Sequence, residues 1–406
     1  MVIGGGAAGF FCAVNAARMN PALEVIIVEK GNRVLNKVRV SGGGRCNVTH
    51  ACFEQAEMIK RYPRGTHFVK KAFHRFFTTD TIRWFEERGV ALKTEADGRM
   101  FPVTNSSQTI IDCLLKEVNR HGVQLWMNRD VTGLERRGEQ WQVSFANGET
   151  VTADYVCIAC GGYPKTTMFD WLTKTGHTIE EPVPSLFTFN MPGNAITQLM
   201  GVSVERAMVR ITGTRLAEQG PLLITHWGMS GPAILRLSAW GARLLHAGRY
   251  EFTALVNWVP AQNEQELREQ FGQLRFDLAP QKIVNKNPFG LPQRLWEYLL
   301  EQSGIKPDIR WADLPAAGQN KLIKNLCAQE FAVKGKTTFK EEFVTAGGIR
   351  LNEVDANTMM SKLQPGLFFA GEILDVDGVT GGFNFQHAWS SGWIAAASVT
   401  ALLQGQ

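Results

Sequence analysis

The sequence predicts an α/β fold in which a parallel-sheet, dinucleotide-binding domain is interrupted by a long insert. Three observations support this prediction. A glycine-rich turn joins an apolar strand to an apolar helix at residues 4–9, the composition changes near residue 188, and an apolar, glycine-rich stretch returns from residue 343. With 406 residues the chain is also too long for one ordinary hydrophobic core. We therefore expect one domain to be built from both ends of the sequence.

The first element is the turn at Gly4–Gly9, which fits the pattern G-x-G-x-x-G before a helix predicted over Ala7–Met19. In such a turn the first glycine makes the tight bend, and the second lets the backbone approach a pyrophosphate. The third glycine allows the helix to pack closely on the strand. The N–H groups at the helix start then face the pyrophosphate. The residues expected to bind it are Gly4, Gly6, Ala7, Ala8 and Gly9.

The second strand, predicted over Leu23–Glu29, ends on an acidic residue 20 positions after Gly9. At this position a carboxylate accepts hydrogen bonds from the ribose hydroxyls of adenosine. A glycine-rich hexamer alone is a weak signal, but its combination with Glu29 is a strong one. Glu29 and the neighbouring Lys30 are therefore expected at a dinucleotide cofactor.

A second glycine-rich block, near the C-terminus, favours FAD over NAD. Residues 366–372 predict a short strand that ends in Gly-Glu, as in glutathione-reductase-like FAD enzymes, where such a strand lies beside the ribityl chain. Residues 381–386 then open the last helix, whose N–H groups can stabilise a reduced, anionic flavin ring. The chain has one G-x-G-x-x-G, so no separate nicotinamide-binding domain is expected. The C-terminal residues expected at FAD are Gly371, Glu372, Asp375, Gly381, Gly382, Phe383, Asn384 and Gln386.

Four blocks together resemble a known family: Ser41–Asn47 (Ser-Gly-Gly-Gly-Arg-Cys-Asn), Thr225–Pro232, Thr345–Gly348 and Gly371–Gln386. Over almost its whole length the chain resembles the BaiN/YhiN-like NAD(P)/FAD-dependent oxidoreductases, also labelled aminoacetone-oxidase-like. The resemblance implies a Rossmann-type, glutathione-reductase-like FAD domain interrupted by a two-part insert, β-rich plus helical. It also implies NAD(P)H as a transient reductant. The substrates it implies are an enone of steroid-like compounds or uridine in ribosomal RNA.

The composition shifts set the expected boundaries of these parts. The FAD-binding domain is expected over residues 1–187 and 343–406, and the β-rich insert over residues 188–260. The helical insert is expected over residues 261–329, and the chain returns through the β-rich part over residues 330–342.

Further cofactor-binding residues follow from the block Ser41–Asn47, which we call the signature block, and from two strand ends. The family shows Ala-Thr-Gly-Gly before the insert, whereas this chain has Ala-Cys-Gly-Gly at residues 159–162. Because the glycines carry the turn, we expect FAD binding to survive this departure. The residues added are Lys37, Ser41, Gly42, Gly43, Gly44, Arg45, Cys46, Asn47, Val131, Ala159, Cys160 and Gly161.

Two residues are candidates for the catalytic acid. Cys46 follows three glycines, and Arg45 and Lys37 are expected to lower the pKa of its thiol. Cys46 then protonates a substrate carbon or simply packs. His226 lies in a glycine-rich loop of the insert and either faces the flavin as an acid or has a structural role. No metal site is expected.

Positive charge is concentrated in one segment, Arg33–Arg75. This segment carries ten basic and two acidic residues, a net +8 within a chain of net +5. Such a patch indicates a polyanionic ligand or nucleic acid, and the alternative is a solvated face with a few phosphate-binding residues. A ribosomal RNA contact through Arg33–Arg75 is therefore one expectation.

The remaining composition points to the cytoplasm and away from the membrane. The seven cysteines are odd in number and scattered, without the spacing of a disulfide framework. No run of about 20 apolar residues is present. No signal peptide is expected, since the first motif begins at Gly4, although the short first strand leads us to expect a few residues before Met1.

Two classes of function remain. In the first, NAD(P)H reduces FAD, and hydride passes to the β-carbon of a conjugated C=C–C=O unit. The substrate is then a uracil of ribosomal RNA or a small or steroid-like enone. In the second, the chain is a non-enzymatic, flavin-containing RNA- or ribosome-binding protein. The observation that supports this hypothesis is the basic segment.

Overall fold

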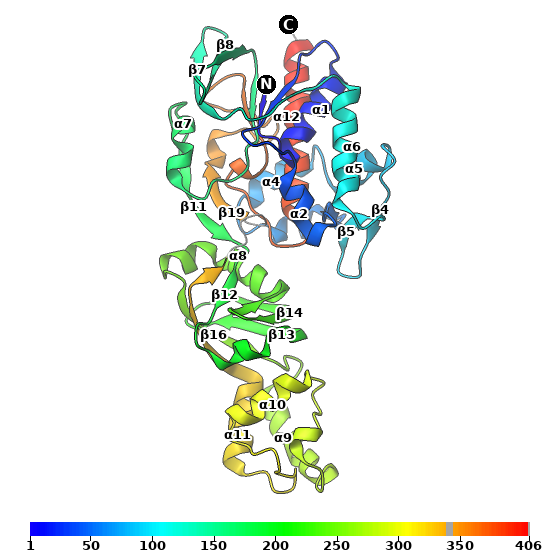
Figure 1. The fold of residues 1–406 in the computed structure, drawn as a ribbon, viewed down its shortest axis with the longest axis vertical. Helices are drawn as coiled ribbons and strands as arrows, with labels where there is room; N and C mark the ends of the chain where they lie inside the picture. Colours follow the sequence, from blue (N-terminus) through cyan, green and yellow to red (C-terminus); the bar gives the residue numbers. More distant parts are fainter. Residues whose placement is uncertain (338–343, 405–406) are drawn as a thin grey trace. The chain divides into compact units, whose positions relative to one another are not determined.

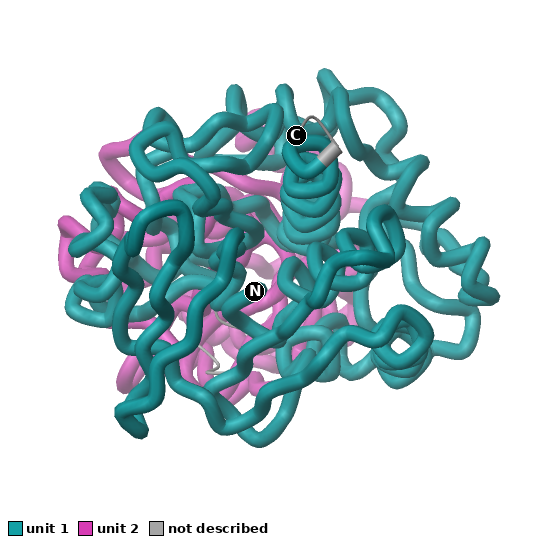
Figure 2. The backbone as a smooth tube through the Cα atoms, turned by 90° about the horizontal axis from the view of Figure 1, so that it is seen from above, with its two compact units in different colours: residues 1–185, 339–406 teal, residues 186–338 magenta. Residues whose placement is uncertain are grey.

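A computed structural model describes residues 1–337 and 344–404 of the chain and divides it into two compact units. Unit 1 comprises Met1–Ser185 and Phe339–Gln406, and unit 2 comprises Leu186–Thr338 (Figure 2). The first unit thus contains both ends of the sequence. The expected return boundary at residue 342 and the expected strand start at Phe343 lie outside the described residues.

Unit 1 is built on a five-stranded parallel sheet of order β20-β10-β1-β2-β6. β1, β10 and β20 are buried at every residue, which is typical of a parallel sheet covered on both faces, whereas the edge strand β6 is partly exposed. The C-terminal strand joins the edge beside β10, with Leu367 opposite Val156. This arrangement confirms the predicted Rossmann-type α/β class. The strands are β1 (Val2–Ile3), β2 (Ile26–Val28), β6 (Gln124–Trp126), β10 (Val156–Ile158) and β20 (Leu367–Phe369).

Two long helices lie against each other beside the sheet (Figure 1). Helix α1 spans Ala7–Met19, the predicted range, and packs along α12, which spans Phe383–Gln404. A Cβ atom at Gly392 would lie 2.6 Å from the carbonyl oxygen of Ala8, so this glycine permits the close helix contact. Helix α6, Ser107–Arg120, also contacts α1, and the Ser106 hydroxyl caps α6 by accepting from the Gln108 N–H (3.3 Å).

Antiparallel sheets complete unit 1. The Asn147-Gly148 dipeptide predicts a hairpin turn, and β8 does pair with β9 there, with Gly148 at φ of 85°. At the boundary of the unit, β11 pairs with β19, and Ser185 faces Val344. The strands are β3 (Thr49–His50), β4 (Leu92–Thr94), β5 (Arg99–Pro102), β7 (Val131–Arg137), β8 (Gln140–Phe145), β9 (Thr150–Ala153), β11 (Ile179–Ser185) and β19 (Val344–Ile349).

The sequence of residues 32–53 predicts a loop, and this prediction is wrong in part, because α2 spans Asn36–Gly44, with non-helical backbone angles at Ser41, Gly42 and Gly43. Leu35 and Val38 are each 1% exposed, and these apolar anchors hold the first turn of the helix. The remaining helices of unit 1 are α3 (Gln55–Met58), η1 (Ile59–Arg61), α4 (Thr66–Phe73), α5 (Thr78–Glu86), η2 (Thr166–Phe169), α7 (Asp170–Thr173), η5 (Leu351–Glu353) and η6 (Gly371–Ile373).

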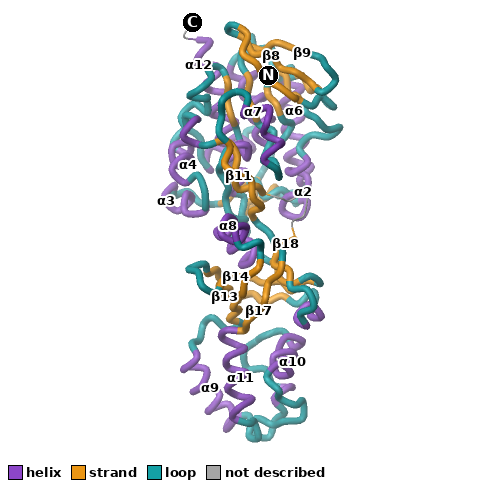
Figure 3. The backbone as a smooth tube through the Cα atoms, turned by 90° about the vertical axis from the view of Figure 1, so that its left-hand side faces the viewer, coloured by secondary structure: helices purple, strands orange, loops and turns teal. Residues whose placement is uncertain are grey.

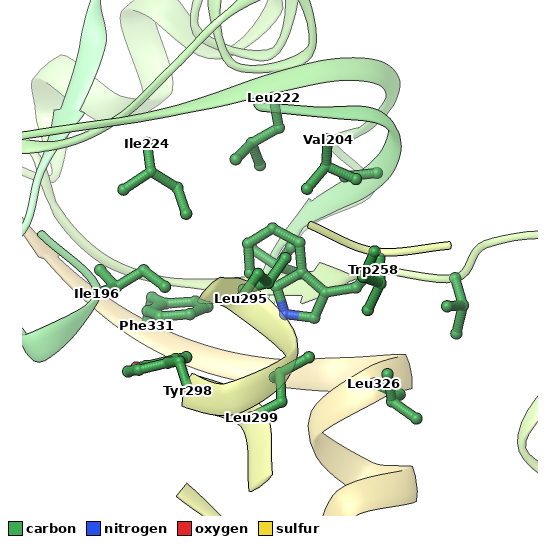
Figure 4. Packing of buried hydrophobic residues seen from close by; sticks show 14 of the residues in the cluster. Ile196, Val204, Leu222, Ile224, Trp258, Leu295, Tyr298, Leu299, Leu326 and Phe331 are labelled. Atoms are coloured by element: carbon green, nitrogen blue, oxygen red, sulfur yellow. The ribbon is translucent and has the colours of Figure 1, made fainter. Parts of the chain in front are cut away.

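Unit 2 combines a seven-stranded antiparallel sheet, of order β17-β16-β13-β14-β15-β12-β18, with a helical part (Figure 3). Its core joins both parts, because Leu295, Leu299 and Leu326 of the helices pack with strand residues around Trp258 (Figure 4). The strands are β12 (Thr188–Asn190), β13 (Ser203–Ile211), β14 (Ala217–Thr225), β15 (Gly228–Ser230), β16 (Glu251–Asn257), β17 (Gln329–Lys334) and β18 (Lys336–Thr337). The helices are η3 (Ala195–Leu199), α8 (Pro232–Ala247), α9 (Glu264–Asp277), η4 (Ile283–Asn285), α10 (Gln293–Gln302) and α11 (Ala316–Ala328).

Within residues 1–337 and 344–404, the structure contains no helix whose length and apolar character would suit a membrane span.

Candidate functional site

The three motif glycines Gly4, Gly6 and Gly9, at the start of α1, have different surroundings. A Cβ atom at Gly4 would lie 2.4 Å from the Ala159 carbonyl oxygen, and one at Gly9 would lie 2.0 Å from the Gly4 carbonyl oxygen. These two positions therefore require glycine for the packing of strand, turn and helix. Gly6 differs, because nothing lies within 4 Å of its Cβ position. The second glycine faces open space, where a pyrophosphate can approach.

The start of α1 suits an anion. Gly6 is the N-cap residue, no side chain caps the helix, and the first turn contains no acidic residue. The first N–H groups of any α-helix lack intrahelical partners and carry the positive end of its dipole. Together with the open space at Gly6, the turn fits the phosphates of a dinucleotide.

Glu29 lies directly beyond β2, as expected. Its two carboxylate oxygens accept hydrogen bonds from the N–H groups of Gly5 (2.9 Å) and Gly31 (2.8 Å). A carboxylate offers about four lone-pair sites, so each oxygen keeps one for a ribose hydroxyl. Lys30 is exposed, with its ammonium 5.7 Å from the ring centre of Tyr163. Val131 is buried at the start of β7.

A polar cradle lies beyond β10. Gly161 has φ of 77°, and the one neighbour of its Cβ position within 4 Å is a Glu372 oxygen at 3.9 Å. Glu372 accepts hydrogen bonds from the Thr345 N–H (2.9 Å) and the Lys37 ammonium (2.5 Å). The Thr345 hydroxyl is buried and has no hydrogen-bond partner among the described residues. An orphaned hydroxyl beside a carboxylate fits a polyhydroxyl chain such as ribityl. Burial raises the pKa of the neighbouring Cys160 to about 11.

The signature block Ser41–Asn47 presents bare backbone to the surroundings. Gly42, Gly43 and Gly44 have φ of 57°, 68° and 83°, a left-handed conformation that favours glycine. All three are exposed, and nothing lies within 4 Å of the Cβ positions of Gly43 and Gly44. A flat ring or an anion can therefore contact this backbone closely.

The expected activation of Cys46 is wrong. Cys46 is fully buried, and burial raises the pKa of its thiol to about 12. Arg45 does not counter this effect, because its guanidinium pairs with Glu95 (2.6 Å) and lies 4.0 Å from the Phe101 ring centre. Lys37 is paired with Glu372 instead. The structure thus gives Cys46 a packing role and Arg45 a role in fixing the loop.

Asn47 joins the signature block to the start of α12. In the amide orientation that satisfies its neighbours, it donates to the Thr49 carbonyl (3.0 Å) and accepts from the Gly382 N–H (3.0 Å). A Cβ at Gly382 would lie 2.6 Å from the Thr49 backbone, so glycine is required there. The Nδ1–H of His50 donates to the Gly381 carbonyl (3.0 Å), and the His50 ring stacks on Phe383 at 4.7 Å.

Two C-terminal residues differ from the expectation. Gln386 is buried, and its carbonyl oxygen accepts from the hydroxyls of Thr49 (2.6 Å) and Thr81 (3.0 Å). Its backbone N–H donates to Gly382, so Gln386 secures the helix rather than a cofactor. Asn384 binds both backbone groups of Gly378 and thereby closes the preceding loop. Asp375 is half-buried beside this loop.

An ion pair that sequence reasoning missed supports this loop. Two guanidinium nitrogens of Arg64 bind the two oxygens of Asp377, which is fully buried, and the Ser185 hydroxyl donates to Asp377 (2.8 Å). Burial raises the pKa of Asp377, while Arg64 and Ser185 oppose that rise. Arg64 was counted with the basic surface. The available signal was a single acidic residue within the apolar run 376–379.

His226 belongs to unit 2, where it is exposed in the turn between β14 and β15. Its ring lies 4.2 Å from the Trp227 ring, edge to face. Its assignment as the acid remains a prediction.

A comparison with known families finds a match to the HI0933-like protein Rossmann domain over residues 1–398. The chain belongs to this family. It is 31% identical over 414 positions to a ribosomal RNA dihydrouridine synthase of Escherichia coli K12, covering 99% of this chain and 98% of that protein. It is 28% identical over 403 positions to a 3-dehydro-bile acid Δ4,6-reductase of Clostridium scindens, covering 97% of each.

Among solved structures, the 3-ketosteroid-Δ4-(5α)-dehydrogenase of Rhodococcus jostii RHA1 superimposes with a TM-score of 0.52 at 14% identity, over 97% of this chain and 96% of that one. At this identity the likeness shows the fold alone. The family match confirms the resemblance found in the signature blocks. The chain is thus a member of a family of FAD-dependent oxidoreductases with a Rossmann-type FAD-binding fold.

Proposed function

We propose that the protein binds FAD and reduces a conjugated C=C bond with NAD(P)H, and that its substrate is a uracil of ribosomal RNA. The cofactor assignment is supported by the open space at Gly6, the uncapped start of α1 and the orphaned Thr345 hydroxyl. Each is a feature that a dinucleotide with a ribityl chain would complete.

FAD, when bound, supplies the hydride chemistry that no side chain provides. The residues of the chain hold and orient it. The start of α1 neutralises the pyrophosphate, and Glu29 and Glu372 accept from hydroxyl groups. The N–H groups at residues 381–383 favour negative charge on the reduced ring. We keep His226 as the proposed acid, since the Cys46 thiol is buried.

The observation that carries the choice of substrate is the basic segment Arg33–Arg75. Eight of its ten basic residues are exposed, and two of these, Lys37 and Lys60, pair with carboxylates. Arg45 and Arg64 are half-buried and also paired. A neutral steroid would form no ion pairs with these positive charges, whereas the phosphates of an RNA backbone would. The relative from Escherichia coli, which is named for ribosomal RNA, supports the same choice.

The test is nucleoside mass spectrometry of ribosomal RNA from a strain that lacks the gene. We expect a dihydrouridine to disappear on deletion and to return with the wild-type gene but not with Gly6→Val. An unchanged dihydrouridine content after deletion would contradict the assignment.

Reduction of a small or steroid-like enone is the second candidate, favoured by the relative named for a bile acid. Steady-state NAD(P)H oxidation separates the candidates, because it rises with RNA in one case and with the enone in the other. A non-enzymatic RNA-binding protein would show neither rise. The exposed glycines 42–44 argue against a non-enzymatic RNA-binding protein, since such a protein needs no exposed glycine backbone beside a cofactor.

A further inference from the structure

Helix α4 and the two residues that follow it carry a face made of cations and histidines. His67, Lys70 and Lys71 on the helix, with His74 and Arg75 just beyond it, recur at helical spacing and are all exposed. The opposite face is apolar and buried, through Phe68, Val69, Ala72 and Phe73. We call the five exposed residues the α4 face.

The segment that carries the α4 face contains no acidic residue. None occurs in the sequence between Glu57 and Asp80. In the described parts of the chain, no residue of the face pairs with a carboxylate, whereas Lys37, Arg45, Lys60 and Arg64 each do. The C-terminal end of the helix dipole attracts Lys70 and Lys71, but such attraction is weak and confined to the last turn. It does not account for five residues on one face.

The segment before α4 is fastened to the loop that leads into α12. The Arg61 carbonyl accepts from the Val379 N–H (2.8 Å), and the Tyr62 hydroxyl donates to the Phe383 carbonyl (2.6 Å). A Cβ at Gly65 would lie 2.6 Å from Val376, so the two segments touch there. Since both belong to unit 1, the α4 face holds a fixed position relative to the start of α12 (Figure 1).

We propose that the α4 face is the docking surface for the ribose–phosphate backbone of the RNA substrate, an inference that rests on the proposed function. Its charges are exposed and uncompensated, which suits contacts that position a nucleic acid without reading its sequence. Because the α4 face is anchored on the loop before α12, an RNA bound to this face would be held in a fixed position relative to the cofactor-binding unit.

The experiment uses the FAD-loaded, full-length protein and a full-length, unmodified ribosomal RNA transcript. The test variant is Lys70→Gln/Lys71→Gln/Arg75→Gln. The matched control, Lys116→Gln/Lys165→Gln/Lys174→Gln, removes the same charge from exposed sites elsewhere in unit 1. Lys70→Arg/Lys71→Arg keeps the charge and serves as the rescue. Flavin content and Tm verify that each variant is folded. If the triple variant does not fold, Arg75→Gln alone replaces it as the test variant.

For the test variant we expect RNA affinity to fall at least tenfold at 0.1 M salt, and the slope of log K against log[salt] to shrink by about one per lost phosphate contact. The KM for RNA should rise while the turnover of free uridine stays unchanged. The control and the rescue should match the wild type. An equal loss in the control, or an unchanged slope in the test variant, would overturn the proposal.

Failure of the proposed function gives a different pattern. If the wild type binds RNA through the α4 face but forms no dihydrouridine, docking stands and the reaction assignment falls. If the wild type reduces RNA and the test variant does so with the same KM and the same salt slope, the docking proposal is contradicted while the proposed reaction stands. Binding of the α4 face to vesicles of anionic lipid, with no RNA affinity, would also overturn docking.

Discussion

At the scale of single residues, Gly6 separates cofactor binding from folding. Nothing lies within 4 Å of its Cβ position, so Gly6→Val should fold, yet its branched side chain would occupy the approach of the pyrophosphate. We expect a soluble, colourless protein, checked by the flavin absorbance of the purified protein and by FAD released on heating.

Two glycine variants serve as controls. Gly9→Ala should destabilise the fold itself, since its Cβ would lie 2.0 Å from the Gly4 carbonyl oxygen. Gly272→Ala, on α9 with an open Cβ position, should leave both flavin and stability intact. A yellow Gly6→Val protein with full flavin would show that the phosphate site lies elsewhere.

His387 should make stability depend on pH. The residue is buried in α12, and burial lowers its pKa from 6.5 to about 4. Because the unfolded chain takes up a proton below about pH 6.5 and the folded one does not, the free energy of unfolding should decrease as the pH falls from 6.5 to 4. The lowered pKa corresponds to about 3 kcal/mol at the acid end of this range.

Urea unfolding of the wild type and of His387→Gln at several pH values measures this contribution. Glutamine can still donate to the Gly371 carbonyl, which the His387 ring contacts at 3.3 Å. The variant should lose stability less steeply than the wild type between pH 6.5 and 4. Parallel curves would show that His387 titrates normally in the folded protein.

At the scale of elements, the Arg64–Asp377 pair should be the main support of the loop before α12. Removing one partner of a buried pair leaves an uncompensated charge, which costs about 3–5 kcal/mol. Asp377→Asn should therefore lower the free energy of unfolding by this amount and weaken FAD binding. The exposed Lys60–Glu57 pair provides the control, and Lys60→Ala should leave the free energy of unfolding nearly unchanged. Equal effects of the two substitutions in urea unfolding would refute this account.

The sequence predicted the elements whose signals are local. The turn at Gly4–Gly9, the helix Ala7–Met19 and the position of Glu29 after the second strand depend on spacing within a single strand–turn–helix unit, and the structure places all three as predicted. The binding of a ribose by Glu29 stays a prediction. The predicted sheet class followed from the same unit together with the apolar C-terminal strand.

Long-range contacts explain what could not be predicted. Cys46 and Gln386 stand in glycine-rich motifs, yet both are buried, and Gln386 bonds to Thr49, 337 positions away. Spacing along the chain does not reveal such burial. Arg64 shows the same limit, because its partner lies 313 positions away and the residue resembled the exposed cations around it.

At the scale of the whole molecule, the two units should be separable. Ser185 and Val344 are partners in adjacent strands of unit 1, so a short linker can join them. Replacing residues 186–343 by a Gly-Ser linker should give a yellow protein that binds FAD, because the proposed cofactor residues all lie in unit 1. We also expect no turnover of substrate, because the deletion removes His226, the proposed acid. Loss of FAD from a folded deletion protein would contradict the division.

We propose that this flavoprotein reduces uracil in ribosomal RNA. The most direct measurement incubates the FAD-loaded protein with NAD(P)H and unmodified ribosomal RNA and quantifies dihydrouridine by mass spectrometry, beside a steroid-like enone under the same conditions. We predict that dihydrouridine forms, and forms faster than the enone is reduced. No dihydrouridine with the wild-type protein, or faster turnover of the enone than of any RNA, would contradict the claim.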